Sequence, residues 1–182
     1  MSRYAKIKKF DIANGSGIRT SIYFSGCPIH CKGCFNQELW NPNYGKEYTE
    51  ETYQEIKNSM NEHIAGLSIL GGEPLSDYNI DTVIELCKRF REDFPNKNIW
   101  LWTGYEIDKL SQKQEYAFTL VDVVTVGPFI EELKDLSLSW AGSSNQTTFI
   151  KSEIAYGKNP QSAKFVFIAE NPIFTFTTKG DI

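Results

Sequence analysis

Three cysteines, Cys27, Cys31 and Cys34, lie close together in the segment GCPIHCKGCFN, residues 26–36. Thiolates are soft ligands that suit zinc, copper(I) and iron–sulfur clusters. Because His30 lies inside the same segment, a Cys₃His zinc site is one interpretation. His30 and Cys31 are adjacent, however, and neighbouring side chains of an extended loop point apart. No second ligand pair follows at the spacing of structural zinc sites. On spacing alone, an iron–sulfur cluster with one open iron and the other metal sites remain alternatives.

The fourth cysteine, Cys87, stands apart in NIDTVIELCKRF. Apolar residues recur there with the spacing of one helix face: Ile80, Val83, Ile84, Cys87 and Phe90. This pattern predicts that Cys87 is a small core residue and not a ligand. A ferredoxin-type cluster with four thiolates would require Cys87 to leave that helix face.

The composition predicts one folded domain over residues 1–182, with 41% hydrophobic and 23% charged residues. The net charge of −4 gives no broad basic surface, so we expect neither nucleic acid nor membrane as a partner. No run of 18 apolar residues occurs, and MSRYAKIKKF lacks the apolar core of a signal peptide. We therefore expect a cytoplasmic protein, in which clustered cysteines indicate metal or redox chemistry before disulfides.

Strand-like and helix-like segments alternate along the chain. Strands are predicted at 20–25, 66–70, 98–102 and 121–126, and helices at 50–61, 77–92 and 105–116. Such alternation indicates a parallel sheet with right-handed crossovers. A closed eight-stranded barrel takes about 250 residues, so we expect an α/β fold that is an incomplete, open (β/α) partial barrel of TIM type.

The core of this domain is predicted at about residues 8–150. The tail AKFVFIAENPIFTFTT, residues 163–178, has two β-prone runs around a turn signal. It predicts a C-terminal β-hairpin extension, within about 157–182, that either covers an open edge of the sheet or contacts a partner; the covering role is favoured because exposed edges aggregate.

Unusual residues follow each predicted strand. The cysteine loop follows 20–25, GGEP follows 66–70, TGY follows 98–102 and GPF follows 121–126. The carboxyl ends of parallel strands meet at one rim, where α/β proteins bind their ligands. We therefore expect these four loops to form one site.

The pattern Cys27-x₃-Cys31-x₂-Cys34, followed by GGEP at 71–74, resembles the radical S-adenosylmethionine superfamily. More specific likenesses lie at 14–40 (NGSGIRTSIYFSGCPIHCKGCFNQELW), 102–105 (WTGY), 127–129 (GPF) and 142–146 (GSSNQ). These segments resemble the activating proteins of anaerobic ribonucleoside-triphosphate reductase, which are glycyl-radical enzyme activases. The likeness covers about residues 8–150.

The resemblance implies an oxidoreductase whose [4Fe–4S] cluster has three cysteine ligands, Cys27, Cys31 and Cys34. The open iron takes S-adenosyl-L-methionine, which is cleaved reductively to a 5′-deoxyadenosyl radical. That radical removes hydrogen from a backbone glycine of the reductase, and no side chain is catalytic. The implied partners are the large glycyl-radical subunit of the reductase and a flavodoxin-like electron donor.

The resemblance also implies a set of cofactor-binding residues: Gly33, Cys34, Phe35, Gly71, Gly72, Glu73 and Pro74. The two glycines of GGEP allow close backbone approach, Glu73 supports the methionine ammonium, and Pro74 stiffens the turn. Many superfamily members have an aromatic residue where this chain has Gly33, and Phe35 is expected to take that packing role. Asn145 and Gln146 are candidate partner contacts.

Three alternatives stay open. The chain resembles activases of other glycyl-radical enzymes, such as pyruvate formate-lyase, although WTGY and GSSNQ favour the reductase activators. Two alternatives of a different class are a small electron-transfer iron–sulfur protein and a zinc-binding module.

Overall fold

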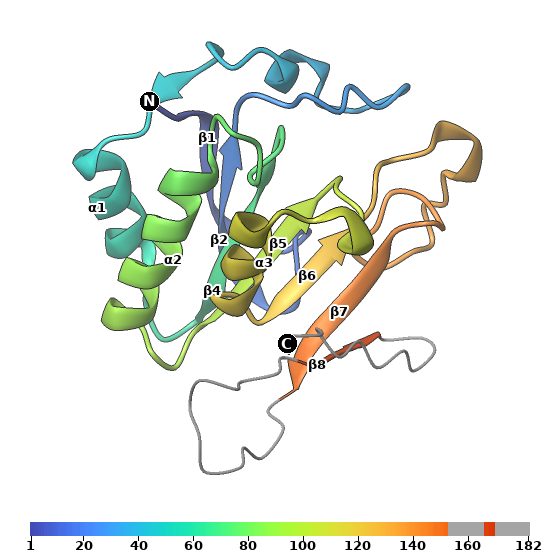
Figure 1. Ribbon diagram of the computed structural model, residues 1–182. Helices are drawn as coiled ribbons and strands as arrows, with labels where there is room; N and C mark the ends of the chain where they lie inside the picture. Colours follow the sequence, from blue (N-terminus) through green and yellow to red (C-terminus); the bar gives the residue numbers. More distant parts are fainter. Residues whose placement is uncertain (153–165, 170–182) are drawn as a thin grey trace, which may run out of the picture.

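One mixed β-sheet organises the chain (Figure 1). The computed structural model describes residues 1–152 and 166–169. Within them, the sheet has eight strands in the order β3-β1-β2-β4-β5-β6-β7-β8. The strands are β1 (Arg3–Asp11), β2 (Ile18–Phe24), β3 (Lys46–Glu47), β4 (Ile64–Gly71), β5 (Asn98–Thr103), β6 (Val123–Val126), β7 (Thr147–Ser152) and β8 (Val166–Ala169).

The four central strands, β2, β4, β5 and β6, pair in parallel. Their connections carry the helices α1 (Glu50–Ser59), α2 (Ile80–Asp93) and α3 (Gln112–Thr119). The predicted alternation of strands and helices is therefore confirmed. Antiparallel strands extend this centre on both sides, β1 next to β2 and β7 next to β6, and the sequence did not predict either of them.

Two predicted helix starts were wrong. The helix expected at 105–116 begins only at Gln112, because Ser111 forms a capping box with Gln114 and stops the helix there. A short 3₁₀ turn, Ile107–Lys109, precedes it. Likewise α2 begins at Ile80, with Asn79 at its N-cap position, three residues later than predicted. The helix predicted at 50–61 does begin at Glu50, where Thr49 forms a capping box with Thr52.

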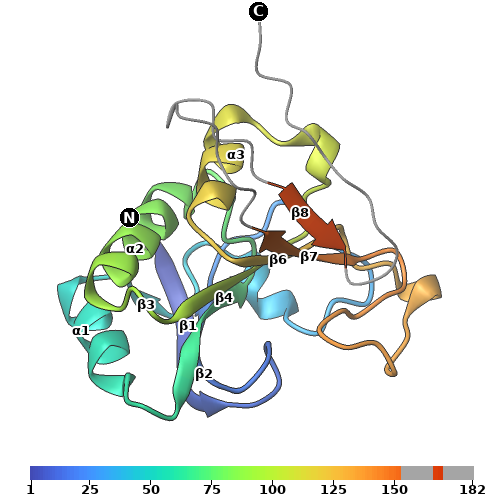
Figure 2. The same cartoon turned by 90° about the horizontal axis from the view of Figure 1, so that it is seen from below.

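The hydrophobic core lies between the three helices and the sheet. It includes alternate residues of β2, β4 and β5 together with helix side chains, among them Ile22, Phe24, Leu67, Ile69, Tyr53, Ile56, Val83 and Phe90. Cys87 belongs to this core and is fully buried, as predicted. Viewed from below, α1 and α2 lie on one side of the sheet and the loop that follows β6 lies on the other (Figure 2).

The sheet is open, with β3 and β8 as its outermost strands. Its description as part of a TIM-type barrel stays a prediction, as does the single domain over 1–182 with a core at 8–150. Of the predicted tail hairpin, only β8 is described, and it pairs antiparallel with β7. The rest of the extension lies outside the described residues. Among the helices that the structure describes, none is long and apolar enough to cross a membrane.

Candidate functional site

A pocket of about 610 Å³ lies where the parallel strands end. It is lined by residues of all four loops that the sequence predicted to meet there: Cys27, Cys31 and Cys34; Gly71, Gly72 and Glu73; Trp102, Thr103 and Gly104; Gly127 and Phe129. Parallel pairing causes this meeting, because it brings the carboxyl ends of β2, β4, β5 and β6 to one edge.

The cysteine loop begins directly after β2 and is fixed at its base by backbone hydrogen bonds. Gly26 N donates to the Leu39 carbonyl over 2.8 Å, and Cys27 N donates to the Trp40 carbonyl over 3.2 Å. These bonds bring the 3₁₀ turn Gln37–Trp40 back against the first cysteine. The three thiols are free, and burial raises the pKa values of Cys27 and Cys31.

The donor set fits an iron–sulfur cluster with three protein ligands. Three thiols from one loop line one pocket, whereas Cys87 is enclosed in the core and takes no part. Across residues 1–152 and 166–169, no three His, Cys, Asp or Glu side chains are gathered closely enough to hold one metal ion. A cluster has several irons, so its ligands need not converge on one point. The His30 ring stacks on Trp40, with centroids 4.6 Å apart, and His30 does not line the pocket that the three cysteines share.

The glycines of GGEP let the end of β4 pass closely under the cysteine loop. A Cβ on Gly71, whose φ is +123°, would lie 2.5 Å from Phe24 N. A Cβ on Gly72 would lie 2.7 Å from the Leu39 carbonyl oxygen and 3.0 Å from that of Gly26. Side chains are excluded here by backbone atoms, which cannot move aside.

Glu73 joins two of the strand-end loops. Its carboxylate is 1% exposed and accepts hydrogen bonds from Leu75 N (2.9 Å), Thr103 Oγ1 (2.8 Å) and Gly104 N (2.8 Å). Burial raises the pKa of Glu73 to about 7, although these donors act in the opposite direction. The carboxylate therefore fixes the end of β5 to the GGEP turn. Its predicted contact with the methionine ammonium stays a prediction.

Not every predicted cofactor-binding residue lies on the pocket wall. Phe35 does; it is 69% exposed, and its ring centroid lies 5.9 Å from that of Phe129. Gly33 is outside the lining and faces Glu131, whose side chain would lie 2.8 Å from an added Cβ. Pro74 is buried behind the pocket. The cofactor roles of Gly33 and Pro74 stay predictions.

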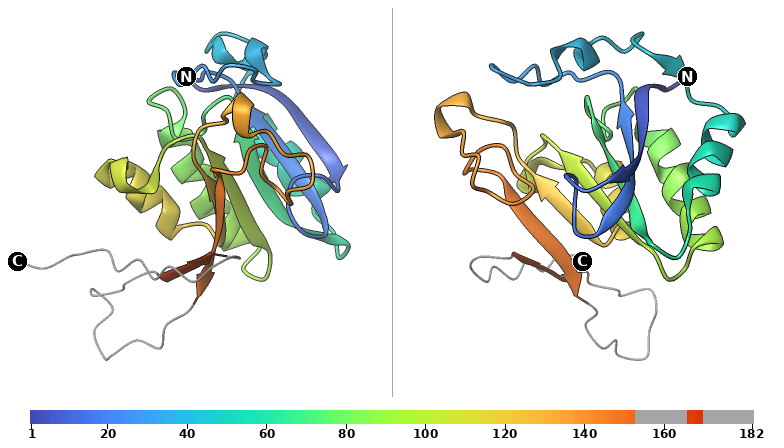
Figure 3. Two further views of the ribbon diagram at one scale, coloured as in Figure 1. Left: turned by 90° about the vertical axis from the view of Figure 1, so that its right-hand side faces the viewer. Right: turned by 180° about the vertical axis from the view of Figure 1, so that it is seen from behind.

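The loop between β6 and β7, residues 127–146, forms a larger part of the pocket wall than the GPF segment that the sequence predicted there. It supplies Leu136, Leu138 and Trp140 to the pocket. Figure 3 shows it at the same edge of the sheet as the cysteine loop, and Lys32 forms ion pairs with Glu131 and Glu132 across the gap. The alternating apolar residues Leu136, Leu138 and Trp140 were the available signal.

The GSSNQ segment anchors this wall. Asn145 Nδ2 donates to the Pro128 carbonyl, and Gln146 Nε2 donates to the Gly127 carbonyl. Gln146 Oε1 accepts from Gly142 N over 2.7 Å. The two amides thus bind their own loop, and their predicted contact with a partner stays a prediction.

The glycine-rich turn between β1 and β2, residues 12–17, brings Ala13 and Asn14 to the pocket. Asn14 Nδ2 donates to Asp11 Oδ2 and to Tyr23 Oη. Arg19 is fully buried below this turn, where it binds Ser68 Oγ, and Ser68 Oγ in turn donates to the Asn14 carbonyl. These hydrogen bonds hold the turn in position as part of the pocket wall.

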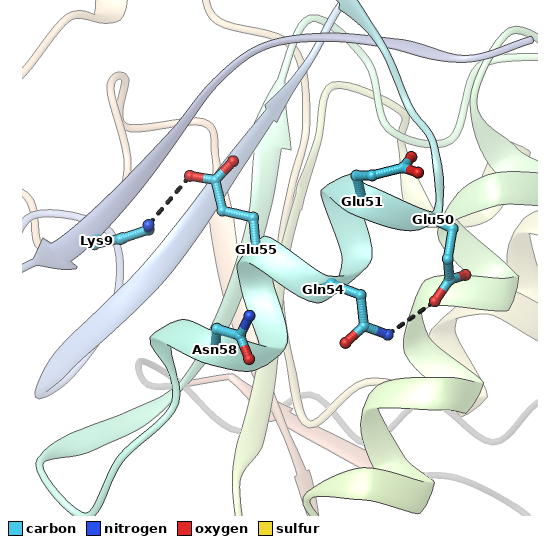
Figure 4. A pocket seen from close by; sticks show the side chains of 6 residues that line it. All are labelled: Lys9, Glu50, Glu51, Gln54, Glu55 and Asn58. Carbon is cyan, nitrogen blue, oxygen red and sulfur yellow. Dashed lines mark hydrogen bonds and ion pairs between the residues drawn. The ribbon is translucent and has the colours of Figure 1, made fainter.

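A second hollow, of about 430 Å³, lies beside α1 and carries none of the predicted residues (Figure 4). Its lining consists of polar residues, half of them acidic: Lys9, Glu50, Glu51, Gln54, Glu55 and Asn58. Several of these groups are already paired, Lys9 with Glu55 and Gln54 with Glu50. The hollow is a solvated surface of the first helix.

Residues 13–149 match the family model described as a 4Fe-4S single cluster domain. The match defines the class of the protein and agrees with the three thiols at the strand-end pocket, and it supports an iron–sulfur cluster over the zinc alternative.

Relatives specify the class further. The anaerobic ribonucleoside-triphosphate reductase-activating protein of Escherichia coli (strain K12) is 39% identical over 146 residues, which cover 79% of this chain and 95% of that protein. Proteins of the same name from Vibrio cholerae and Enterobacteria phage T4 are 38% and 35% identical, over 79% of this chain and 94% and 90% of their own lengths. The chain belongs to the family of anaerobic ribonucleoside-triphosphate reductase-activating proteins.

Proposed function

We propose that this protein activates an anaerobic ribonucleoside-triphosphate reductase as a radical S-adenosyl-L-methionine enzyme. The observation that carries the proposal is the meeting of three free thiols, the GGEP turn and two further strand-end loops in one pocket. The names of the relatives support the reductase as the protein on which it acts.

Cys27, Cys31 and Cys34 are proposed to hold a [4Fe–4S] cluster through three irons, which leaves the fourth iron to S-adenosyl-L-methionine. When bound, the cluster supplies one electron for cleavage of the sulfonium, and the 5′-deoxyadenosyl radical that results takes a hydrogen atom from a glycine of the reductase. An open coordination position is the general feature of catalytic metal sites.

The chain itself supplies position and shielding. Gly71 and Gly72 present backbone without side chains to the pocket, and Glu73 keeps the loops after β4 and β5 at a fixed separation. Phe35 and Phe129 provide apolar surface at the mouth. These groups are proposed to hold S-adenosyl-L-methionine and exclude water from it.

Two protein partners complete the proposal. One is the large glycyl-radical subunit of the reductase, whose glycine must reach the pocket. The other is a one-electron donor of the flavodoxin type that reduces the cluster. Both interactions are expected in the cytoplasm.

An anaerobic assay tests the proposal directly. The full chain with reconstituted iron and sulfide is incubated with dithionite and S-adenosyl-L-methionine, with and without the large subunit. When the large subunit is present, we expect 5′-deoxyadenosine by chromatography and a glycyl radical by electron paramagnetic resonance. Without the subunit, we expect neither product. A reduced cluster that forms no 5′-deoxyadenosine would instead indicate an electron-transfer protein. A radical in pyruvate formate-lyase and none in the reductase would indicate the other activase.

A further inference from the structure

Trp40 has a buried hydrogen-bond donor that no other described residue satisfies. Its indole Nε1 is excluded from solvent and has no partner. A buried indole N–H usually finds an acceptor, and an unpaired buried donor costs about 1–3 kcal/mol. A donor left in this state within an otherwise satisfied site requires an explanation.

The position of Trp40 suggests what the donor is for. Within the described chain, five buried side-chain atoms lack a partner: Arg3 Nε, Ser25 Oγ, Trp40 Nε1, Asn79 Oδ1 and Asn145 Oδ1. Of the residues that carry them, only Trp40 lines the pocket that contains the three cysteines. The unpaired donor is therefore carried by a residue of the site, and the atom itself is covered by protein next to the cysteine loop.

Trp40 is also held firmly next to the first cysteine. Its carbonyl accepts from Cys27 N, and its ring stacks on His30, with centroids 4.6 Å apart and an interplanar angle of 25°. His30 has a left-handed backbone with φ of +52°, a conformation that costs energy in a residue with a side chain. Cys27 and Trp40 line both the main pocket and a third hollow, which Pro28, His30 and Tyr78 also line, so both residues lie between these two hollows.

We infer that the indole N–H of Trp40 donates a hydrogen bond to the thiolate sulfur of Cys27 when that cysteine holds the iron–sulfur group. The inference rests on the proposed function, since it needs a cluster at these cysteines. Sulfurs of such clusters accept hydrogen bonds, and these bonds tune the reduction potential. The positive end of the N–H dipole faces the negative charge that reduction adds, so the bond favours the reduced state. Trp40 thereby makes the cluster easier to reduce.

The main test is Trp40→Phe, which keeps an aromatic ring for stacking on His30 and removes the N–H. The midpoint potential of the reconstituted cluster is measured by anaerobic titration without S-adenosyl-L-methionine. We expect at least a threefold fall in the ratio of reduced to oxidised cluster at a fixed ambient potential. A tenfold fall would correspond to about 59 mV for this one-electron couple.

Trp102→Phe is the matched control. It also removes an indole N–H from the pocket wall, but that N–H is already bound to the Trp140 carbonyl over 2.8 Å. The control should therefore leave the midpoint potential unchanged. Equal potentials in wild type and Trp40→Phe, or equal shifts in both variants, would overturn the inference.

A measurement on the wild-type protein avoids any folding defect of the variant. Protein labelled with ¹⁵N in the indole ring of tryptophan is reduced, and pulsed electron paramagnetic resonance is used to detect nitrogen coupled to the cluster. We expect a ¹⁵N coupling that is lost in Trp40→Phe and kept in Trp102→Phe. Its absence from wild type overturns the inference even when the protein cleaves S-adenosyl-L-methionine normally. If instead no cluster assembles at all, the proposed function fails first.

Discussion

The face of the central sheet that the helices cover buries mainly hydrocarbon, whereas the opposite face buries charged and hydroxyl groups. On β2 the contrast falls on alternate residues. Ile22 and Phe24 enter the core with the helices, while Arg19 and Ser21 are fully buried on the other side. Alternation along a strand produces this division, because successive side chains point to opposite faces.

The polar face is satisfied by directional bonds. Arg19 donates to Ser68 Oγ (2.6 Å) and Asn98 Oδ1 (2.6 Å) and lies over the Trp100 ring. Burial lowers the pKa of Arg19 to about 10, so the guanidinium stays charged at neutral pH. Asp11 accepts from Lys8, Ala13, Asn14 and Ser21.

The difference indicates a division of labour between the two faces. Apolar burial is non-directional and supplies most of the folding free energy. Hydrogen bonds to buried charges are directional, so they can hold a loop in one position. In this protein they hold the turn before β2 in the wall of the pocket, and the cysteine loop extends from the far end of the same strand.

The largest expected effect comes from replacing cysteines, one at the pocket rim and one in the helix-covered core. Cys27→Ala should abolish cluster assembly and 5′-deoxyadenosine formation, because two thiolates cannot replace three at the rim. Cys87→Ala, on the helix face, should lower the free energy of unfolding by about 1–2 kcal/mol and keep the cluster. Visible absorption and the anaerobic assay measure both variants. Loss of the cluster in Cys87→Ala would show that the core cysteine is a ligand.

Two phenylalanine variants provide a second comparison between the core and the pocket mouth. Phe90 is fully buried between α2 and its neighbours, so Phe90→Ala should lower the free energy of unfolding by about 3–5 kcal/mol. Phe35→Ala, at the exposed mouth, should change it by less than about 0.5 kcal/mol. Urea denaturation of the two variants measures the difference. Comparable losses of the free energy of unfolding in the two variants would mean that Phe35 at the pocket mouth stabilises the fold as a core residue does.

The polar face predicts a dependence of stability on pH. Burial alone would raise the pKa of Asp11, but hydrogen bonds from Lys8, Ser21, Asn14 and the Ala13 backbone lower it from 3.8 to about 2. A carboxyl group whose pKa is lower in the folded state stabilises the protein above its unfolded pKa. About 2 kcal/mol should therefore be lost as the pH falls from 4 to 2.

Asp11→Asn tests this pH dependence, since it removes the titrating group. Urea denaturation is compared between wild type and variant at several pH values. The difference between their free energies of unfolding should shrink below pH 4. A constant difference across that range would contradict the assignment to Asp11.

The smallest effect is expected at the ion pairs between the cysteine loop and the 127–146 wall. The Lys32 side chain is 77% exposed. Its Nζ lies 3.2 Å from Glu131 Oε2 and 3.0 Å from Glu132 Oε1. Exposed pairs of this kind contribute little to stability, so Lys32→Ala should leave the midpoint of urea denaturation unchanged. A clear fall in that midpoint at moderate salt would show that these pairs hold the two loops together.

Local patterns in the sequence determined the central part of this protein. The spacing of Cys27, Cys31 and Cys34, the GGEP turn and the alternation of strands with helices predicted both the elements and their common rim. The helical spacing around Cys87 separated the core cysteine from the others. Periodicity carries this information because it depends only on residues a few positions apart.

Tertiary structure decided how the rim is closed and supported. Glu73 binds residues about 30 positions away, and Trp102 binds Trp140 across 38 positions. No local spacing encodes such contacts, so the sequence did not show that Asn145 and Gln146 bind the backbone of their own loop. The unpaired N–H of Trp40 is likewise invisible in the chain, because whether a donor finds an acceptor depends on every segment that folds around it.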